Sequence, residues 1–402
     1  MRRHTVTENS IVNQKLKQAS EILDEVGIDL WLIVARESDT LGDPSMPLVV
    51  GTSVTWESAF LISRDGDHKA IVGTGDVDNV LQTGAWTDVE GYVESLGPAL
   101  QAAIEQRKPR SIGLSYSTDN SMADGLTYGM YLELERFLGK TPYWDCVTSA
   151  EPVASRLRAR KSAEEIQRIR EAIATTETIW AETAEWLRPG LSEQQISDFM
   201  HSRLDHYSVD SSWDWKYCPT VMAGPNSPEG HVGPSDIVTE AGHLLAIDFG
   251  VKQNEYTSDM QRTFYFLQDG ETEAPAELVE AFGVVDAAIQ AGANALKPGV
   301  TGWEVDLAAR QVLEEYGAAE WKFAFGHQMG RACHDGGTVL GPRWDRYGQR
   351  PYDLIEESQI YTLEIGFPVA GRGRVQLEED VVVTANGCEF LSDPQRSLIL
   401  IG

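Results

Sequence analysis

The chain has 402 residues, and its 62 acidic against 33 basic side chains give a formal net charge of −29 at pH 7. This charge repels phosphate backbones and anionic lipid surfaces, so we expect neither nucleic acid nor a membrane as a partner. Four scattered cysteines without CxxC spacing, no apolar leader and no run of about 18 apolar residues predict a cytoplasmic protein without disulfides.

The first part of the chain alternates helical and strand patterns. The stretch "VNQKLKQASEILDEVGID" predicts an amphipathic helix that ends at Gly27, and "LWLIVAR" after it predicts a buried strand. "SAFLISRDGDHKAIVG" is typical of a hairpin that turns at Asp65 and Gly66. These alternations indicate an α/β domain, and it holds no recognisable catalytic cluster.

A long polar helix is predicted from about residue 160, in "RKSAEEIQRIREAIATTETIWAETAEWL". Ser162 and Glu165 have capping-box spacing at its start, and Pro189-Gly190 ends it. Because 402 residues exceed what one hydrophobic core usually supports, we expect two domains. We place their boundary before this helix, at residues 1–152 and 153–402.

The second domain contains an internal similarity. Residues 186–209 and 295–318 share a helix end, a Pro-Gly turn, a Ser or Thr at a capping position and a second amphipathic helix. About sixty residues after each copy comes a strand that carries a carboxylate, Asp248 in one case and Glu364 in the other. The pattern predicts two related halves that face one another.

Two hairpins are expected to carry facing carboxylates. A turn on Gln253 and Asn254 would place Asp248 opposite Asp259, with the two side chains on one face. A hairpin centred in the "AGRGR" loop would place Glu364 opposite Glu378. One such pair would be explained as well by exposed acids or a shared proton, but two pairs favour a site for divalent metal ions.

Histidines supply nitrogen near this predicted site. His327 and His334 lie in the glycine-rich stretch "AFGHQMGRACHDGG", where a helix is disfavoured and the backbone can approach a site closely. His327 is the natural imidazole ligand to complete the oxygen set. His334, and His231 in "SPEGHVGPSD", are candidates for hydrogen bonds to a substrate.

These residues resemble a known family. Asp248, Asp259, His327, Glu364 and Glu378, in the contexts "IDFG", "SDMQRTF", "GHQMGRACHD", "TLEIG" and "LEEDVVVT", look like the five metal ligands of the M24 metallopeptidases. The resemblance covers the whole chain and implies an N-terminal α/β domain followed by an α+β "pita-bread" catalytic domain with pseudo-two-fold symmetry, as in the creatinase, prolidase and aminopeptidase P branch.

The resemblance also implies roles for the ligands. Asp248 would hold one metal ion, Asp259 and Glu378 would bridge two, and His327 with Glu364 would hold the other. The ions would be Mn²⁺, or alternatively Co²⁺, Fe²⁺ or Zn²⁺. A metal-activated water would attack the scissile carbonyl of a small peptide, an Xaa-Pro substrate by analogy with the branch.

Three residues would act directly on the substrate if the resemblance holds. Glu364 resembles the residue that shuttles a proton. His334 would donate a hydrogen bond to the carbonyl oxygen as charge develops on it, and His231 would contact the scissile amide or its leaving amine.

The sequence departs from the family pattern in places that bear on the substrate. Gln376 stands where aminopeptidase P and prolidase have an arginine, and the position four before His327 is Phe323 rather than histidine. The segment 337–352 is rich in arginine and aromatic residues. It is either a solvated loop or a recognition loop in which Arg343 or Arg346 binds a substrate carboxylate.

We therefore expect a metal-dependent aminopeptidase or dipeptidase that assembles as a homodimer. The first alternative is an amidohydrolase of a small non-peptide substrate, such as a creatine-like or ectoine-like compound, on the same scaffold. The second is a binding module that has lost catalysis, and the five intact ligand positions argue against it.

Overall fold

The structure is a computed structural model that describes residues 6–39, 42–230 and 232–402. The chain divides into two compact units, residues 1–158 and 159–402. The division falls near the end of helix α6 (Glu151–Ala159), a few residues after the boundary at residue 153 that the sequence predicts. No helix in the described ranges has the length and apolar character needed to cross a membrane.

The N-terminal unit is built on a mixed six-stranded sheet with the strand order β4-β3-β2-β1-β5-β6. Its strands are β1 (Leu30–Ala35), β2 (Ser58–Ser63), β3 (His68–Gly73), β4 (Val89–Tyr92), β5 (Ile112–Leu114) and β6 (Val147–Ser149). The expected hairpin forms between β2 and β3, and Gly66 at its turn has a φ of 89°. The predicted α/β character of this unit is confirmed.

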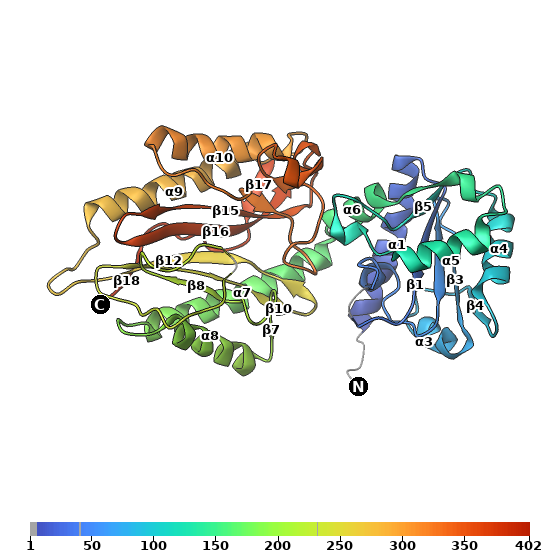
Figure 1. The fold of residues 1–402 in the computed structure, drawn as a ribbon, viewed down its shortest axis with the longest axis horizontal. Helices are drawn as coiled ribbons and strands as arrows, with labels where there is room; N and C mark the ends of the chain where they lie inside the picture. The colour runs from blue at the N-terminus through green and yellow to red at the C-terminus, as the bar shows by residue number, and fades with distance from the viewer. Residues whose placement is uncertain (1–5, 40–41, 231) are drawn as a thin grey trace. The chain divides into compact units, whose positions relative to one another are not determined.

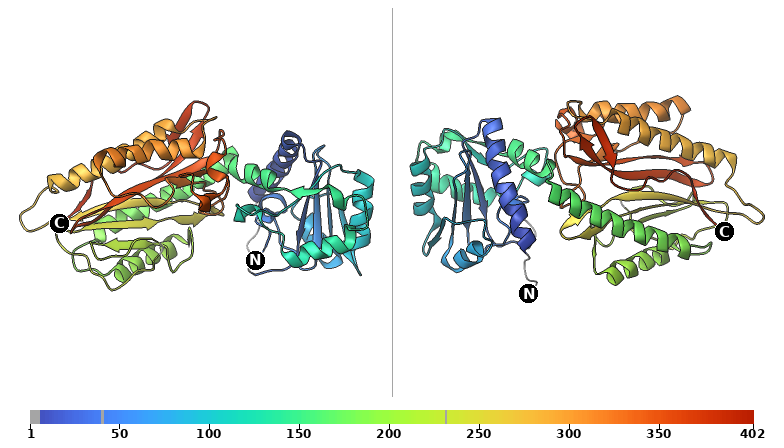
Figure 2. Two further views of the ribbon diagram at one scale, coloured as in Figure 1. Left: turned by 45° about the horizontal axis from the view of Figure 1, so that its top comes forward. Right: turned by 180° about the vertical axis from the view of Figure 1, so that it is seen from behind.

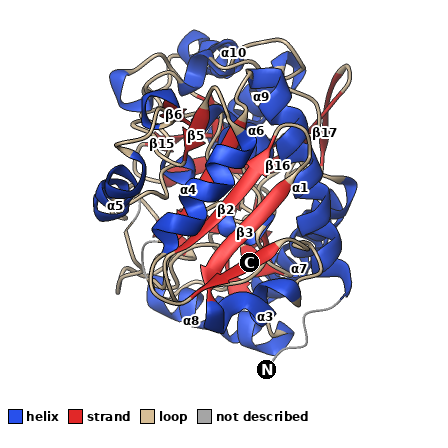
Figure 3. Cartoon of the chain, turned by 90° about the vertical axis from the view of Figure 1, so that its right-hand side faces the viewer, coloured by secondary structure: helices blue, strands red, loops and turns tan. Residues whose placement is uncertain are grey.

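Helices cover both faces of this sheet. They are α1 (Val6–Val26), α2 (Met46–Val49), α3 (Val77–Leu81), α4 (Leu96–Arg107), α5 (Tyr128–Leu138) and α6. Strand β1 packs its odd-numbered side chains against the α1 side and its even-numbered ones against the α4 and α5 side. Burial on two faces explains why "LWLIVA" is continuously apolar rather than alternating. Figure 3 shows α4 and α1 on either side of β2 and β3.

The C-terminal unit is built on a seven-stranded sheet, in which β15-β16-β12-β9-β8 form the continuous path while β17 pairs with β16 and β18 with β12. Its strands are β8 (Thr220–Ala223), β9 (Leu244–Phe249), β12 (Met260–Phe266), β15 (Ile360–Val369), β16 (Gly373–Thr384), β17 (Gly387–Phe390) and β18 (Ile399–Ile401). Two smaller sheets join β7 (Asp210–Ser211), β10 (Val251–Gln253) and β11 (Tyr256–Thr257), and β13 (Gly326–His327) with β14 (Val339–Leu340).

Two similar helix pairs flank this sheet, as the internal similarity of the sequence predicts. They are α7 (Ala163–Trp186) with α8 (Glu193–Tyr207), and α9 (Ala276–Ala295) with α10 (Gly302–Tyr316). Ser192 and Thr301 begin the second helix of each pair with a capping box. Figures 1 and 2 show one pair on each side of the sheet. The helix predicted near residue 160 is α7, whose capping box on Ser162 and Glu165 is present.

Candidate metal centre

The first hairpin differs in register from its prediction. Strands β9 and β12 pair Asp248 with Gln261, not with Asp259. The turn lies one residue later than expected, on Asn254 and Glu255, which both have positive φ values, 50° and 69°. The pairing is therefore shifted by two residues. Because strand side chains alternate with a period of two, the shift leaves Asp259 on the same face as Asp248, as a diagonal neighbour.

A glycine lets this hairpin change direction beside the site. Gly250 follows β9, and a Cβ atom there would lie only 2.0 Å from the carbonyl oxygen of Ser258. The ladder is interrupted at this point, between the strands β9 and β10 on one side and β11 and β12 on the other. Asp259 thus lies in an irregular segment, held by its backbone N–H, which donates to Asp380 Oδ2 at 3.2 Å.

The second hairpin has the register that the sequence predicts. Strands β15 and β16 pair Glu364 directly with Glu378. Strand β16 also pairs with β12, so that Glu378 lies opposite Gln261. Four neighbouring strands therefore carry a continuous row of side chains across the sheet: Asp248, Gln261, Glu378 and Glu364. Residues opposite one another share a face, so this row brings the two hairpins to one place.

His327 joins the row from the short strand β13. Its backbone N–H donates to Thr362 Oγ1 at 3.3 Å, and its Nε2 atom lies 3.6 Å from Asp259 Oδ2 and 3.9 Å from Glu378 Oε1. One donor atom from each of His327, Asp259 and Glu378 lies within 4.8 Å of the others. The structure thus gathers all five predicted ligands around one space.

The cluster is poorly satisfied as a set of bare acids. Asp259 and Glu378 are 4% and 1% exposed. Within the described part of the chain, Asp248 Oδ1, Asp259 Oδ1 and Glu378 Oε2 are buried oxygens without a hydrogen-bond partner. Buried polar atoms without partners are uncommon in folded proteins and call for an explanation such as a bound ion. Divalent cations fit, because they take carboxylate oxygens together with imidazole nitrogen.

The pKa values of the clustered side chains also favour a bound cation. Burial raises the pKa of Asp248 to about 7, and burial together with the charge of Asp248 raises the pKa of Glu364 to about 8. Burial and the neighbouring carboxylates hold the pKa values of Asp259 and Glu378 well above their usual range. Burial holds the pKa of His327 well below its usual range, which leaves a neutral imidazole that can bind a metal. A cation at this place would restore the charged carboxylates.

Two residues that the sequence analysis did not assign to the site hold its carboxylates. Gln261 Nε2 donates to Glu364 Oε2 at 3.3 Å. The Cys333 thiol donates to Asp259 Oδ2 at 2.8 Å, and Cys333 is buried. Its place directly before His334, in the stretch that supplies His327, is the signal that could have suggested proximity to the metal site.

The cluster opens into a cavity of about 500 Å³. His334 and Gln376 line it, as their predicted roles require. Its wall also contains aromatic and charged side chains, among them Trp213, Asp214, Tyr217, Glu229, Trp321, Phe323, Tyr347 and Arg350. His231 lies outside the described residues, although its neighbour Gly230 lines the cavity.

The two arginines predicted to face the substrate do not line this cavity. The Arg343 guanidinium lies 4.4 Å from the centre of the Trp303 ring. The Arg346 guanidinium lies over the rings of Trp344 and Tyr347 and donates to the carbonyl oxygen of Lys322. Arg350, from the same segment, is the arginine that lines the cavity, and its Nε atom donates to the carbonyl oxygen of Gly337 at 2.9 Å.

Gln376 is oriented by a charged neighbour. Its Oε1 atom accepts a hydrogen bond from Arg374 Nε at 3.1 Å, and Arg374 forms an ion pair with Glu229 at 2.9 Å. Position 376 therefore presents a neutral amide at the cavity wall, and the positive charge of Arg374 beside it is already paired.

Known proteins resemble this chain over nearly its whole length. A family model described as metallopeptidase family M24 matches residues 167–385, more than half of the chain. An uncharacterised peptidase of Bacillus subtilis is 26% identical over 390 residues, which cover 96% of this chain and 100% of that protein. An Xaa-Pro dipeptidase of Pyrococcus horikoshii is 25% identical over 392 residues, which cover 97% of this chain and 99% of that protein.

Solved structures resemble it as well. An Xaa-Pro dipeptidase from Bacillus anthracis has a TM-score of 0.75 at 23% identity and covers 97% of this chain and 100% of that chain. A prolidase from Pyrococcus horikoshii has a TM-score of 0.71 at 23% identity and covers 96% and 99%. These likenesses confirm the predicted pita-bread fold, and the family implies divalent metal ions. The chain belongs to the metallopeptidase family M24 and is a hydrolase.

Proposed function

We propose that the protein is a dinuclear metal-dependent hydrolase that cleaves the amide bond after the first residue of Xaa-Pro peptides. The observation that carries this proposal is the row of carboxylates across four strands, with buried oxygens that lack partners and His327 beside them. The names of two relatives, both Xaa-Pro dipeptidases, support the choice of substrate.

The proposed ligands divide between two ions. Asp248 would bind one, His327 and Glu364 the other, and Asp259 and Glu378 both. Four carboxylates are hard donors, so Mn²⁺ is the proposed ion, while Co²⁺, Fe²⁺ and Zn²⁺ also accept such ligands. When bound, the ions would supply Lewis acidity to a substrate carbonyl and lower the pKa of a water molecule.

The side chains of the cavity would complete the reaction. Glu364, whose Oε2 atom accepts a hydrogen bond from Gln261, would take a proton and pass it to the leaving amine. His334 lines the cavity beside His327, with 4.2 Å between the ring centres, and would donate a hydrogen bond to the carbonyl oxygen of the substrate. His231 is proposed, from the resemblance alone, to contact the scissile amide.

The charged ends of a short peptide would find partners on the cavity wall. We propose that Arg350, rather than Arg343 or Arg346, pairs with the substrate carboxylate, because Arg350 is the one of the three that lines the cavity. Its guanidinium is positioned by the hydrogen bond from Nε to Gly337. Gln376 would add a neutral hydrogen bond to the substrate, with its own orientation set by Arg374.

A non-peptide amide is the second candidate substrate. The observation that favours it is the cavity wall, where Gln376 replaces a charged residue and Trp213, Trp321 and Phe323 supply flat apolar surface. Such a wall also suits a small planar or cyclic compound of the creatine-like or ectoine-like kind.

An activity panel separates the two candidates. The protein is freed of metal, reloaded with Mn²⁺ and assayed with Xaa-Pro dipeptides, Xaa-Pro-Xaa tripeptides and matched peptides with alanine in place of proline. We expect cleavage after the first residue and a preference for proline at the second. Bound metal without turnover of any peptide would overturn the peptidase proposal and direct the assay to small cyclic and guanidino amides.

We also propose that the protein is a cytoplasmic homodimer. All four cysteines are free thiols, as expected in a reducing compartment. Light scattering across micromolar concentrations tests the assembly, and a mass corresponding to the monomer throughout that range would contradict it.

A further inference from the structure

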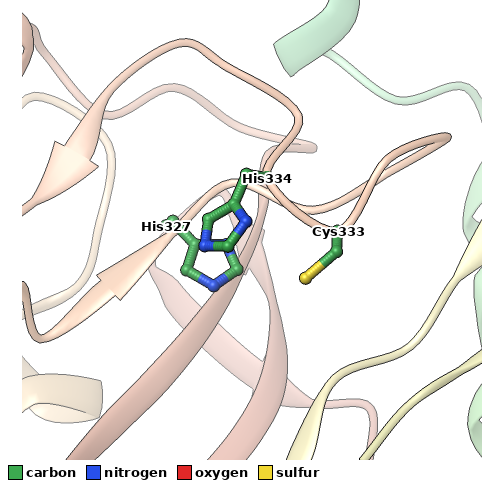
Figure 4. Close-up of side chains that lie close together, drawn as sticks. All are labelled: His327, Cys333 and His334. Atoms are coloured by element: carbon green, nitrogen blue, oxygen red, sulfur yellow. The ribbon is translucent and has the colours of Figure 1, made fainter. Parts of the chain in front are cut away.

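A second group of metal-binding side chains overlaps the carboxylate cluster. One donor atom from each of His327, Cys333 and His334 lies within 4.8 Å of the others. Figure 4 shows the His334 ring overlapping the His327 ring, whose centres lie 4.2 Å apart, with the Cys333 thiol directed toward them. We propose that these three residues form a thiophilic metal site that shares His327 with the carboxylate set and binds Zn²⁺ or Cd²⁺ as an inhibitory ion.

Two contacts bring the sulfur into the space between the ligands. The Cys333 Sγ atom lies 2.8 Å from Asp259 Oδ2, and that same oxygen lies 3.6 Å from His327 Nε2. Cys333 and His327 are buried, whereas His334 is exposed to the cavity. An ion can therefore enter from the cavity and meet the two buried donors behind His334.

Unsatisfied oxygens behind the sulfur also point to a cation. Asp259 Oδ1 and Glu378 Oε2 are buried without a hydrogen-bond partner among the described residues, and their side chains are 95% buried or more. Beside a bound cation these carboxylates would regain their negative charge next to the thiol. A cation held by the sulfur and the imidazoles would be stabilised by this charge even where the oxygens do not bind it directly.

The chemistry of the donors selects the ion. Thiolate and imidazole suit Zn²⁺ and its heavier analogue Cd²⁺, whereas carboxylates suit Mn²⁺. Zinc bonds of about 2.0–2.3 Å in a tetrahedral site put donor atoms roughly 3.5 Å apart. Donor atoms that lie up to 4.8 Å apart would have to close by up to about 1.3 Å, and the exposed His334 side chain has room to rotate toward the other two donors. Solvent would supply the fourth ligand.

Occupation of this site would exclude the proposed reaction. An ion there would take His327 from the carboxylate set and engage His334, the proposed partner of the substrate carbonyl. The thiol proton would be released to solvent as the sulfur binds. Zinc would thus act as an inhibitor that competes with the Mn²⁺-bound state, and the sulfur would determine its affinity.

The test uses Cd²⁺ as the probe, because sulfur bonded to Cd²⁺ gives a charge-transfer absorption in the ultraviolet. The full-length protein is freed of metal and titrated with Cd²⁺ as wild type, Cys333→Ser and, as the matched control, Cys388→Ala, which removes a thiol elsewhere in the same unit. We expect a band that saturates with one bound Cd²⁺ in the wild type and in Cys388→Ala, and no band in Cys333→Ser.

A second measurement follows inhibition. Zn²⁺ is titrated against the Mn²⁺-supported activity of each variant, and each is compared with its own uninhibited rate. We expect half-inhibition of Cys333→Ser to need at least about tenfold more Zn²⁺ than the wild type, since one strong ligand is lost. Serine keeps a donor for Asp259, and thermal melting verifies that the variant is folded.

The Cd²⁺ titrations of the wild type and of Cys333→Ser can each overturn the proposal. Absence of the sulfur band at saturating Cd²⁺, or a band that persists in Cys333→Ser, would show that Cys333 is not a ligand. This readout needs no peptide turnover, so its failure is distinguishable from failure of the proposed peptidase activity.

Discussion

The two carboxylate hairpins of the C-terminal unit both place a pair of acidic side chains on one face of the sheet, but their backbones differ. The β15–β16 ladder is continuous over ten residue pairs and turns through a glycine-rich loop. The β9–β12 ladder breaks at Gly250 and at Ser258-Asp259, and turns on two residues with positive φ. Glu364 therefore lies directly opposite Glu378, whereas Asp248 and Asp259 are diagonal neighbours. A repeated fold can place the same chemical group without repeating its register.

The halves differ further in what else they bring. The second half adds the stretch between α10 and β15, which contains β13 and β14 and supplies His327, Cys333, His334 and Arg350 to the site and the cavity. The first half contributes carboxylates and wall residues such as Trp213. The pseudo-symmetry therefore positions the oxygen ligands, and the asymmetry supplies the nitrogen, the sulfur and the substrate contacts. Four predictions test this division.

The largest effect is expected where the halves meet. Glu378→Gln removes the ligand that is proposed to bind both ions and that lies within the carboxylate row. Asp259 and Glu364 would lose the carboxylate with which they are proposed to share an ion. We expect kcat/KM to fall by at least about 10³-fold, comparable to the loss of a strong electrostatic catalytic contact, together with a loss of bound metal. Steady-state kinetics and elemental analysis measure the two effects.

The matched control is Glu389→Gln on β17, an exposed carboxylate that pairs at long range with Arg170 at 3.8 Å. It should leave activity and metal content as in the wild type. If Glu378→Gln keeps a full complement of metal, the carboxylate row is not the metal site.

The second prediction compares the two hairpins by the pH dependence of the stability that each contributes. In the metal-free protein the pKa of Asp248 is raised to about 7 and that of Glu364 to about 8, mainly by burial. Unfolded acids titrate near pH 4, so folding favours the protonated forms. The resulting stabilisation is complete below about pH 4 and is lost as the pH rises through about 7 to 8.

We therefore expect the melting temperature of the metal-free protein to fall by several degrees between about pH 5 and 8.5, and Mn²⁺ to abolish that fall. Scanning calorimetry with and without chelator measures it. Asp248→Asn and Glu364→Gln should each make the melting temperature less dependent on pH. The variant with the larger reduction identifies the half that contributes more to this pH dependence. A slope of the opposite sign in chelator would contradict the raised pKa values.

The third prediction concerns the added segment of the second half. Arg350→Ala should raise KM for peptides with a free carboxylate by about 10- to 100-fold, the value of one charge-assisted hydrogen-bonded contact. The same peptides with an amidated end should show little change. Arg343→Ala is the matched control, because Arg343 packs on Trp303 outside the cavity. An equal loss with both peptide forms would assign Arg350 to support of the Gly337 backbone instead.

The fold and the grouping of the five proposed ligands could be predicted from the sequence because both depend on short patterns. Alternation and the Pro-Gly turns located the hairpins and helix pairs, and the pairing of Glu364 with Glu378 followed from the glycine turn alone. The register around Asp248 was wrong by two residues, because an Asn-Glu turn carries a weaker signal than Asn-Gly. The sequence pointed to Arg343 or Arg346 and not to Arg350, because segment 337–352 has little regular structure and tertiary contacts orient its side chains.

The smallest effects are expected at the two hairpin turns, where the difference in backbone can be tested directly. Glu255 has a φ of 69°, and its ion pair with Arg331 at 3.3 Å is about half exposed on the glutamate side. Glu255→Gly would relieve roughly 1–2 kcal/mol of left-handed strain, lose up to about 1 kcal/mol to the freer unfolded chain and forfeit about 0.5 kcal/mol of ion pairing. Together these terms should leave the free energy of unfolding within about 0.5 kcal/mol of the wild-type value.

Gly371 presents the opposite case. Its φ is 71° and no atom lies near the position of an added Cβ, so Gly371→Ala would introduce strain without a clash. Left-handed strain would now destabilise the folded chain, and the less flexible unfolded chain would offset part of that cost. We expect the free energy of unfolding to fall by about 0.5–1 kcal/mol. Denaturant unfolding of the metal-loaded variants measures both changes. Stabilisation by Gly371→Ala, or a loss above about 1 kcal/mol in Glu255→Gly, would show that the turns do not differ as their backbone angles indicate, and that the β9–β12 register is set by the carboxylates and not by its turn.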